Sequence, residues 1–150
     1  MTIKDDGRVL LHDTVEERLR RAEQRYTGGR RAIVDVLAGA GHPVSIEDIA
    51  TAVPQLPRSS AYRHLVDLQS AGVVRRVAAH DEFGRFELAE DLTEHHHHLL
   101  CVSCGRLIDV TPSEGFEQNL AKTVEELSGA EGFRPHGHRL DVLGVCAKCQ

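Results

Sequence analysis

The sequence predicts an α+β fold, in which an N-terminal winged helix-turn-helix is followed by a small α/β domain with a four-cysteine site. Three observations support this prediction. Four segments with helical periodicity and then a β-like hairpin occupy residues 1–88. Residues 89–94 (AEDLTE) are polar and acidic, which is typical of a linker. In residues 95–150, strand-like runs surround one helical segment and two Cys-x-x-Cys pairs occur. We therefore expect two domains joined by a hinge.

Capping residues and apolar faces define the first three expected helices. The first is expected to begin at Thr14, with Glu17 completing a capping box. The second, RRAIVDVLAGAG, follows a break at Gly28 and Gly29. Ser45 is expected to cap the third, SIEDIATAV, whose apolar residues share one face.

The fourth expected helix, SSAYRHLVDLQSAG, is capped by Ser59 or Ser60 and ends at Gly72. Residues 73–88 contain two β-like runs around a polar turn with a glycine, which is the pattern of a hairpin. A short helix, a tight turn, a capped helix and a hairpin follow one another in a winged helix-turn-helix. This order is the basis for the predicted first domain.

The second domain combines strands with one helix. We expect strands at 95–101 (HHHHLLC) and 106–110 (RLIDV), joined by the tight turn VSCG. A last strand is expected at 138–146 (HRLDVLGVC), where apolar and polar residues alternate. Between the second and the last of these strands we expect a helix, because four apolar residues have helical spacing: Phe116, Leu120, Val124 and Leu127.

Composition places the chain among globular proteins and suggests where it acts. The 150 residues are 41% hydrophobic and 27% charged, and no apolar run reaches the roughly 20 residues that a membrane span needs. The first residues, MTIKDDGRVLLHD, are acidic where a signal peptide is basic. We therefore expect a cytoplasmic protein without a membrane partner, in a reducing compartment where paired cysteines favour metal binding.

Two Cys-x-x-Cys pairs, Cys101/Cys104 and Cys146/Cys149, are the strongest indication of chemistry. A two-residue gap lets both thiolates of a pair reach one ion, and two pairs complete a tetrahedral site. Such a site suits zinc and leaves no open position for catalysis, so we expect a structural Zn²⁺. A disulfide or a redox-active pair is the competing interpretation, but two pairs flanking a small domain favour zinc.

Four consecutive histidines precede the first cysteine pair. Neighbouring side chains of a strand point to opposite faces, so His95 and His97 would face one way and His96 and His98 the other. The run would then contribute to two separate metal sites, each completed by residues from elsewhere. Imidazole and carboxylate ligands suit zinc, iron, nickel, cobalt or manganese. An exposed polar strand without a ligand role is the alternative.

A local basic surface is expected despite the net charge of −5. Residues 58–76 contain four arginines and a single acid. The fourth helix would be the recognition helix, whose N-terminal residues contact bases and phosphates of double-stranded DNA. The candidate DNA-binding residues are Arg58, Ser59, Ser60, Tyr62 and Arg63.

Four segments together resemble the ferric uptake regulator (Fur) family of bacterial metal-responsive repressors: SSAYRHLVDLQSAGVVRR, GRFEL, HHHHLLCVSCGRLIDV and HGHRLDVLGVCAKC. The resemblance runs from about residue 14 to the C-terminus. It implies a DNA-binding domain at 1–88, a hinge at 89–94 and a dimerisation domain at 95–150. It also implies a homodimer that binds palindromic operator DNA when metallated and controls genes of metal uptake or homeostasis.

The resemblance also implies three sets of metal ligands. The four cysteines match the structural zinc ligands. The sensing-site ligands correspond to His42, Glu87, His96 and His98, with His80 as an alternative to His42. The ligands of a further site in the dimerisation domain correspond to His95, His97, Glu117 and His138. The regulatory ion would be Fe²⁺, Zn²⁺, Mn²⁺ or Ni²⁺.

The sequence leaves several alternative functions to be considered. Zinc-sensing members carry Asp and Cys where this chain has Arg75 and Ala89, which disfavours a zinc sensor of that type. Peroxide-sensing members have Asp at the position of Asp109, so a peroxide-sensing regulator that uses Asp109 as an extra ligand is the main alternative. A metal-storage protein or chaperone would leave residues 30–88 unexplained. An enzyme is not expected, because neither HExxH nor a nucleophile elbow occurs.

Overall fold

The computed structural model describes residues 5–77 and 84–150, with side chains from residue 7 onward. The chain divides into two compact units, one ending at Glu94 and one starting at His95, called here the N-terminal and C-terminal units. No helix in the described residues is long and apolar enough to cross a membrane. The assignment of residues 89–94 as a hinge stays a prediction.

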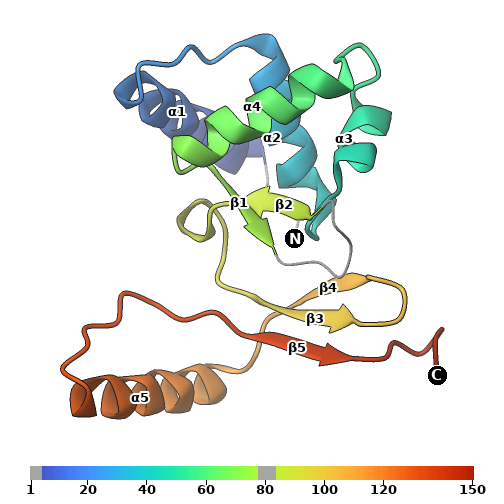
Figure 1. Cartoon of the computed structure of the whole chain (residues 1–150). Helices are drawn as coiled ribbons and strands as arrows, with labels where there is room; N and C mark the ends of the chain where they lie inside the picture. Colours follow the sequence, from blue (N-terminus) through green and yellow to red (C-terminus); the bar gives the residue numbers. More distant parts are fainter. Residues whose placement is uncertain (1–4, 78–83) are drawn as a thin grey trace. The chain divides into compact units, whose positions relative to one another are not determined.

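The N-terminal unit consists of helices and a small sheet (Figure 1). Strands β1 and β2 pair antiparallel, and Val44 forms a bridge with Phe86 of β2. The order of elements is that of a winged helix-turn-helix, as predicted. The elements are α1 (Asp5–Arg21), α2 (Gly28–Ala40), α3 (Ile46–Ala52), α4 (Arg58–Ser70), β1 (Val74–Val77), β2 (Arg85–Leu88) and the short 3-10 helix η1 (Glu90–Leu92).

A single apolar core holds these helices together. Each helix buries one face, and burial of each aliphatic side chain stabilises the fold by about 1.5–3 kcal/mol. On α4 the buried face consists of Ala61, Leu65 and Leu68, so the opposite face of this helix is left for solvent. The other helices bury Leu11, Val15, Leu19, Ile33, Val34, Leu37, Ile46 and Ile49.

The expected starts of two helices are wrong. Helix α1 begins at Asp5, because its apolar stripe continues N-terminally to Leu11, and Thr14 lies within the helix. The Thr14 hydroxyl donates to the carbonyl of Leu10 at 2.8 Å, four residues back, and caps nothing. Helix α2 begins at Gly28, since Thr27 accepts a hydrogen bond from the Arg30 amide and acts as its cap.

The starts of α3 and α4 differ in whether a side chain caps the helix. Ser45 caps α3 as predicted and forms a capping box with Asp48. Helix α4 has Pro57 at its cap position and no side-chain cap bond. Ser59 and Ser60 therefore lie within the first turn of α4. The expectation that one of them caps this helix is wrong.

Close packing of α2 against α4 fixes the position of α4. A Cβ atom added to Gly29 would lie 2.8 Å from Nε2 of His64, so a larger residue at this position would require the His64 ring to move. Arg30 of α2 forms an ion pair with Asp67 of α4. Burial and the nearby Arg30 charge lower the pKa of His64, which favours the neutral imidazole in this contact.

The C-terminal unit consists of a three-stranded sheet and one helix. Its elements are β3 (His97–Cys101), β4 (Leu107–Val110), α5 (Glu114–Ala130) and β5 (Asp141–Gly144). The strand order is β4-β3-β5, with β3 antiparallel to β4 and parallel to β5. The last strand is shorter than the expected 138–146, so His138 precedes it.

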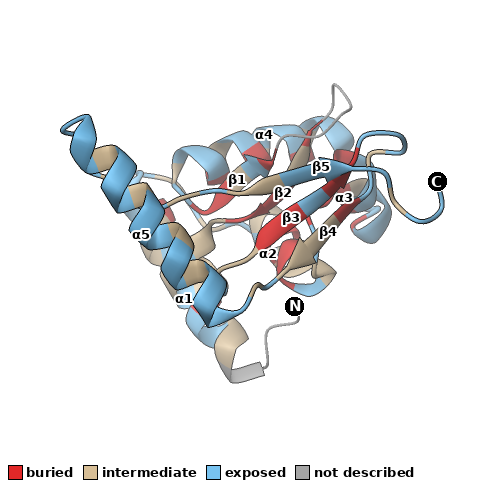
Figure 2. Cartoon of the chain, turned by 90° about the horizontal axis from the view of Figure 1, so that it is seen from below, coloured by how far each residue is buried: buried red, intermediate tan, exposed pale blue. Residues whose placement is uncertain are grey.

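The apolar core of the C-terminal unit is small. Its buried apolar residues are Leu100, Cys101 and Leu107, and none of the 17 residues of α5, all of them described, is buried (Figure 2). A core of this size rarely stabilises a domain without metal ions, disulfides or association. The unit therefore needs a further source of stability.

Candidate metal centres

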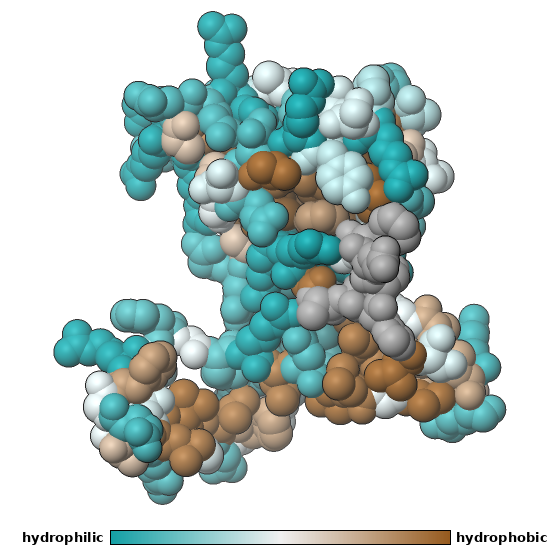
Figure 3. All heavy atoms as spheres, in the orientation of Figure 1, coloured by the Kyte–Doolittle hydropathy of each residue, from teal (hydrophilic) through white to brown (hydrophobic). Residues whose placement is uncertain are grey.

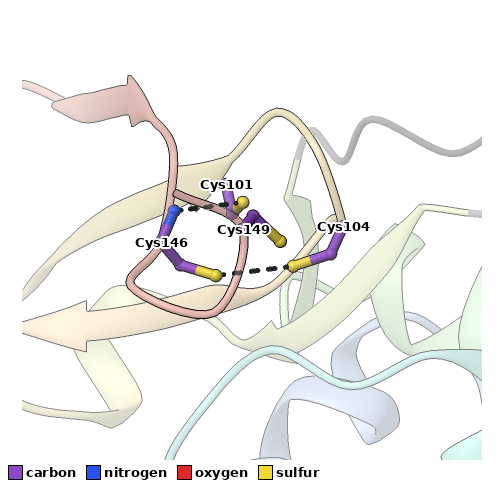
Figure 4. Close-up of side chains that lie close together, drawn as sticks. All are labelled: Cys101, Cys104, Cys146 and Cys149. Atoms are coloured by element: carbon purple, nitrogen blue, oxygen red, sulfur yellow. Dashed lines mark hydrogen bonds between the residues drawn. The ribbon is translucent and has the colours of Figure 1, made fainter.

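The four cysteines come from two turns that the sheet brings together (Figure 4). Cys101 ends β3 and Cys104 lies in the turn after it, whereas Cys146 and Cys149 lie in the turn after β5. Because β3 and β5 are parallel and Cys101 pairs with Gly144, both turns occur at the same end of the sheet.

The distances among the thiols suit a tetrahedral zinc ion. All four Sγ atoms lie within 4.8 Å of one another, and the cysteines are free. Cys104 and Cys146 have their Sγ atoms 3.8 Å apart, far beyond the ~2.05 Å of a disulfide. Four sulfurs at about 2.3 Å from one zinc ion would be about 3.8 Å apart. The donor set therefore fits a structural zinc ion.

The thiols also differ in acidity. The backbone amide of Cys146 donates to Sγ of Cys101 at 3.3 Å, and this bond and other backbone bonds lower the pKa of Cys101 to about 6. At Cys149, a hydrogen bond from Ser103 lowers the pKa, but the neighbouring thiols of Cys146 and Cys104 outweigh it and raise the pKa to about 12. Several thiolates at this spacing repel one another, and a divalent cation would remove that cost.

A second group lies entirely within the C-terminal unit and centres on Glu117 of α5. Its ligand atoms, from His95, His97, Glu117 and His138, lie within 4.8 Å of one another. Nε2 of His97 donates to Glu117 at 2.8 Å. Nε2 of His138 and of His95 lie 3.1 Å and 3.3 Å from the other carboxylate oxygen. Three imidazoles and one carboxylate form a suitable donor set for a divalent transition metal.

The charge on Glu117 is favoured in this position. Burial raises the pKa of Glu117, but the hydrogen bond from His97 and the charges of His95 and His138 outweigh it and lower the pKa. The carboxylate is therefore ionised and ready to bind a cation. His97 is only 2% exposed, so its contact with Glu117 belongs to the interior of the unit.

The other two histidines of the run lie with Asp109 of β4. The rings of His96 and His98 are 5.1 Å apart between centroids, and Nε2 of His98 lies 3.7 Å from Asp109. The ligand atoms of these three residues lie within 4.8 Å of one another. The run therefore divides by strand alternation, with His95 and His97 on the Glu117 side and His96 and His98 on the Asp109 side.

Asp141 is a site residue that the sequence did not single out. His98 is 1% exposed, and its Nδ1 donates to Asp141 of β5 at 3.0 Å. The second oxygen of Asp141 lies 2.9 Å from Nε of Arg139. With Nδ1 protonated and bonded in this way, Nε2 of His98 is the nitrogen available to a metal ion. Asp141 therefore orients His98.

The remaining predicted sensing residues belong to the N-terminal unit. Glu87 of β2 is buried and forms an ion pair with Arg75 of β1. His42 is exposed, and its Nδ1 donates to the carbonyl of Pro43 at 3.0 Å. His80 lies outside the described residues.

The candidate DNA-binding residues occupy the first two turns of α4. Ser59, Tyr62 and Arg63 are exposed. Nη2 of Arg63 lies 3.4 Å from the Ser60 hydroxyl, and Arg58 forms an ion pair with Glu47 of α3. Val66, one turn further on, is 61% exposed and adds an apolar side chain to the same face, which the sequence prediction omitted.

Comparison with known proteins identifies the family. The model of the "Ferric uptake regulator family" matches residues 21–143. The chain belongs to this family. It is 30% identical to the "Peroxide operon regulator" of Bacillus subtilis (strain 168) over 149 residues, which cover 94% of this chain and 96% of that protein.

Solved structures of Fur proteins share the fold. The ferric uptake regulator of Helicobacter pylori superposes with a TM-score of 0.77 at 20% identity, over 99% of this chain and 96% of that chain. The Vibrio cholerae ferric uptake regulator gives a TM-score of 0.65 at 28% identity, over 87% of this chain and 98% of that chain. These matches confirm the predicted fold class.

Fur-family proteins are metal-responsive transcriptional regulators that bind DNA as dimers. The predicted family and class of function are thereby confirmed for this chain. It is a transcriptional regulator and not an enzyme.

Proposed function

We propose that the chain is a repressor that acts in the cytoplasm as a homodimer on palindromic double-stranded operator DNA and controls genes of metal uptake or homeostasis. Binding would require a divalent ion at a hinge site. The observation that carries this proposal is the division of the histidine run into two ligand groups. His96 and His98 are among the first residues of the C-terminal unit, directly after the winged-helix unit, and their ligand atoms lie with that of Asp109.

The hinge ion would be held by residues of both units. His96, His98 and Asp109 belong to the C-terminal unit, and Glu87 and His42 to the N-terminal unit. An ion with ligands from both units restricts their relative movement and favours one arrangement. If that arrangement also binds DNA, metal and operator strengthen each other's binding, typically by ~1–3 kcal/mol. Fe²⁺, Zn²⁺, Mn²⁺ and Ni²⁺ all suit this mixture of imidazole and carboxylate ligands.

The other two groups would have structural roles. Zn²⁺ in the four-cysteine site would stabilise the C-terminal unit directly. A second ion between His95, His97, Glu117 and His138 would tie α5 to β3 within the same unit and so influence the shape of the dimer.

The C-terminal unit offers an apolar surface for a second copy. Apolar side chains gather on the face that carries β5 (Figure 3). Leu143 of β5 is 65% exposed, and Phe133 after α5 is 68% exposed. Exposed apolar surface of this kind is typical of a homodimer interface. A two-fold dimer would present two α4 helices to the two halves of a palindrome.

Replacement of Arg63 by alanine tests the role of α4. Arg63 is exposed on the second turn of α4, and its Nη2 lies 3.4 Å from the hydroxyl of Ser60 in the first turn. It does not belong to the buried face of α4, so its loss leaves the fold intact. We expect operator affinity to fall by at least about tenfold, as for loss of a base or phosphate contact. Fluorescence anisotropy with labelled operator measures this, at one fixed salt concentration.

The matched control is Arg134→Ala, which removes the same charge from an exposed position in the C-terminal unit. It should bind the operator like the wild type, and both variants should keep their metal content. Unchanged affinity in Arg63→Ala would show that another element contacts the bases.

Peroxide sensing is the second candidate, and Asp109 favours it. This carboxylate lies with His96 and His98 in the proposed hinge site, and the relative from Bacillus subtilis is named a peroxide operon regulator. Hydrogen peroxide oxidises Fe²⁺ readily and Mn²⁺ poorly. A peroxide sensor loaded with iron should therefore lose operator binding after brief peroxide treatment, whereas the manganese-loaded protein should keep it. Equal resistance of both forms would reject this candidate.

A further inference from the structure

Arg75 makes two ion pairs beside the proposed hinge site. It is the cross-strand partner of Glu87 in the β1–β2 register. Its Nε donates to Oε1 of Glu87 at 2.5 Å, and its Nη1 donates to Oε2 of Glu90 in η1 at 3.2 Å. The Glu87 side chain is 8% exposed and that of Arg75 is 25% exposed, so solvent screens this pair only partly.

We infer that Arg75 is a built-in counter-ion of Glu87 that sets the metal concentration at which the hinge site fills. The inference rests on the proposed role of Glu87 as a ligand. A divalent ion bound to Glu87 shares the carboxylate with the guanidinium, and the two cations repel each other. Arginine stays charged at all physiological pH values, so Arg75 weakens metal binding permanently.

Glu90 moderates this effect. It accepts from Arg75 through a second nitrogen, so it shares the positive charge that would otherwise act on Glu87 alone. Glu90 is held in place independently, because its neighbour Asp91 forms an ion pair with Arg18 of α1, and Arg18 also donates to the carbonyl of Gly72. Loss of the Glu90 charge should therefore change the electrostatics and leave η1 attached.

Two substitutions are expected to change metal affinity in opposite directions. Arg75→Gln removes the repelling charge and should bind Mn²⁺ about tenfold more tightly, while Glu90→Gln should bind it several-fold more weakly. If Arg75 mainly oriented Glu87, or supported the fold, its loss would weaken binding. The opposite signs therefore separate charge competition from a positioning or structural role.

The measurement is a competition titration of the full-length zinc-loaded dimer with Mn²⁺ against a chromophoric chelator. Arg76→Gln, the adjacent residue on the opposite face of β1, is the matched control and should bind Mn²⁺ like the wild type. Arg75→Lys keeps the charge and should stay within about threefold of the wild type. Circular dichroism checks the fold of each variant, and Glu90→Gln provides a test that leaves both Arg75 and Glu87 in place.

The outcomes distinguish this inference from the proposed function. Weaker or unchanged Mn²⁺ binding by Arg75→Gln, or unchanged or tighter binding by Glu90→Gln, overturns the inference. Glu87→Gln should lose most of the hinge affinity. If Glu87→Gln instead binds Mn²⁺ like the wild type, Glu87 is not a ligand, and the proposed hinge site itself is wrong.

Discussion

Cys101→Ser is expected to release the structural zinc ion and unfold the C-terminal unit. The unit buries few apolar side chains, and α5 buries none. Structural zinc ions contribute about 10–16 kcal/mol to the folding of small zinc-binding peptides, whereas a whole domain is stable by only about 5–15 kcal/mol. Loss of one of four thiolates therefore removes most of the stability of this unit. Mass spectrometry of metal content and circular dichroism measure the two effects.

Val102→Ser is the matched control for this prediction. Val102 is the next residue in the chain and is exposed, so its replacement leaves all four thiols in place. The control should keep one zinc ion per chain and sediment as the wild-type dimer, whereas Cys101→Ser should be largely monomeric or aggregated. Zinc-free wild-type protein together with a normally folded Cys101→Ser variant would contradict the structural-site assignment.

Local sequence patterns predicted the features that depend on neighbouring residues. The two-residue spacing of each cysteine pair is a property of one turn, and the sorting of the histidines follows from strand alternation. The pairing of strands in the sheet then determines contacts between distant residues, which residue spacing alone cannot predict. Forty-one residues lie between the two cysteine pairs, and parallel pairing of β3 with β5 brings the pairs together.

The missed residues depend on contacts between distant segments. Asp141 meets His98 only because β5 pairs with β3, and 42 residues separate them in the chain. Arg75 was grouped with a basic, phosphate-binding surface, yet its guanidinium lies against Glu87 and Glu90. The error at Thr14 has a different cause, since its capping pattern was outweighed by Leu11, which lies further N-terminal and extends the buried face of α1.

Neighbouring histidines of the run are expected to differ sharply in function. His96→Ala should abolish metal-activated operator binding while the protein stays a folded dimer, whereas His95→Ala should only weaken it. His96 lies with His98 and Asp109, the proposed hinge ligands of the C-terminal unit. Its loss should remove the metal dependence of DNA binding, a change of roughly 5–150-fold in affinity. Glu87→Ala should have the same effect from the other unit.

The two variants are controls for each other, because they make the same substitution at adjacent positions of one segment. After loss of His95, Glu117 keeps its contacts with His97 and His138, so the second group retains three of its four ligands within one unit. Operator binding is measured by anisotropy during a Mn²⁺ titration, and size-exclusion chromatography checks the dimer. If His95→Ala loses activation and His96→Ala keeps it, the regulatory ion belongs to the Glu117 group, and the roles of the two sites must be exchanged.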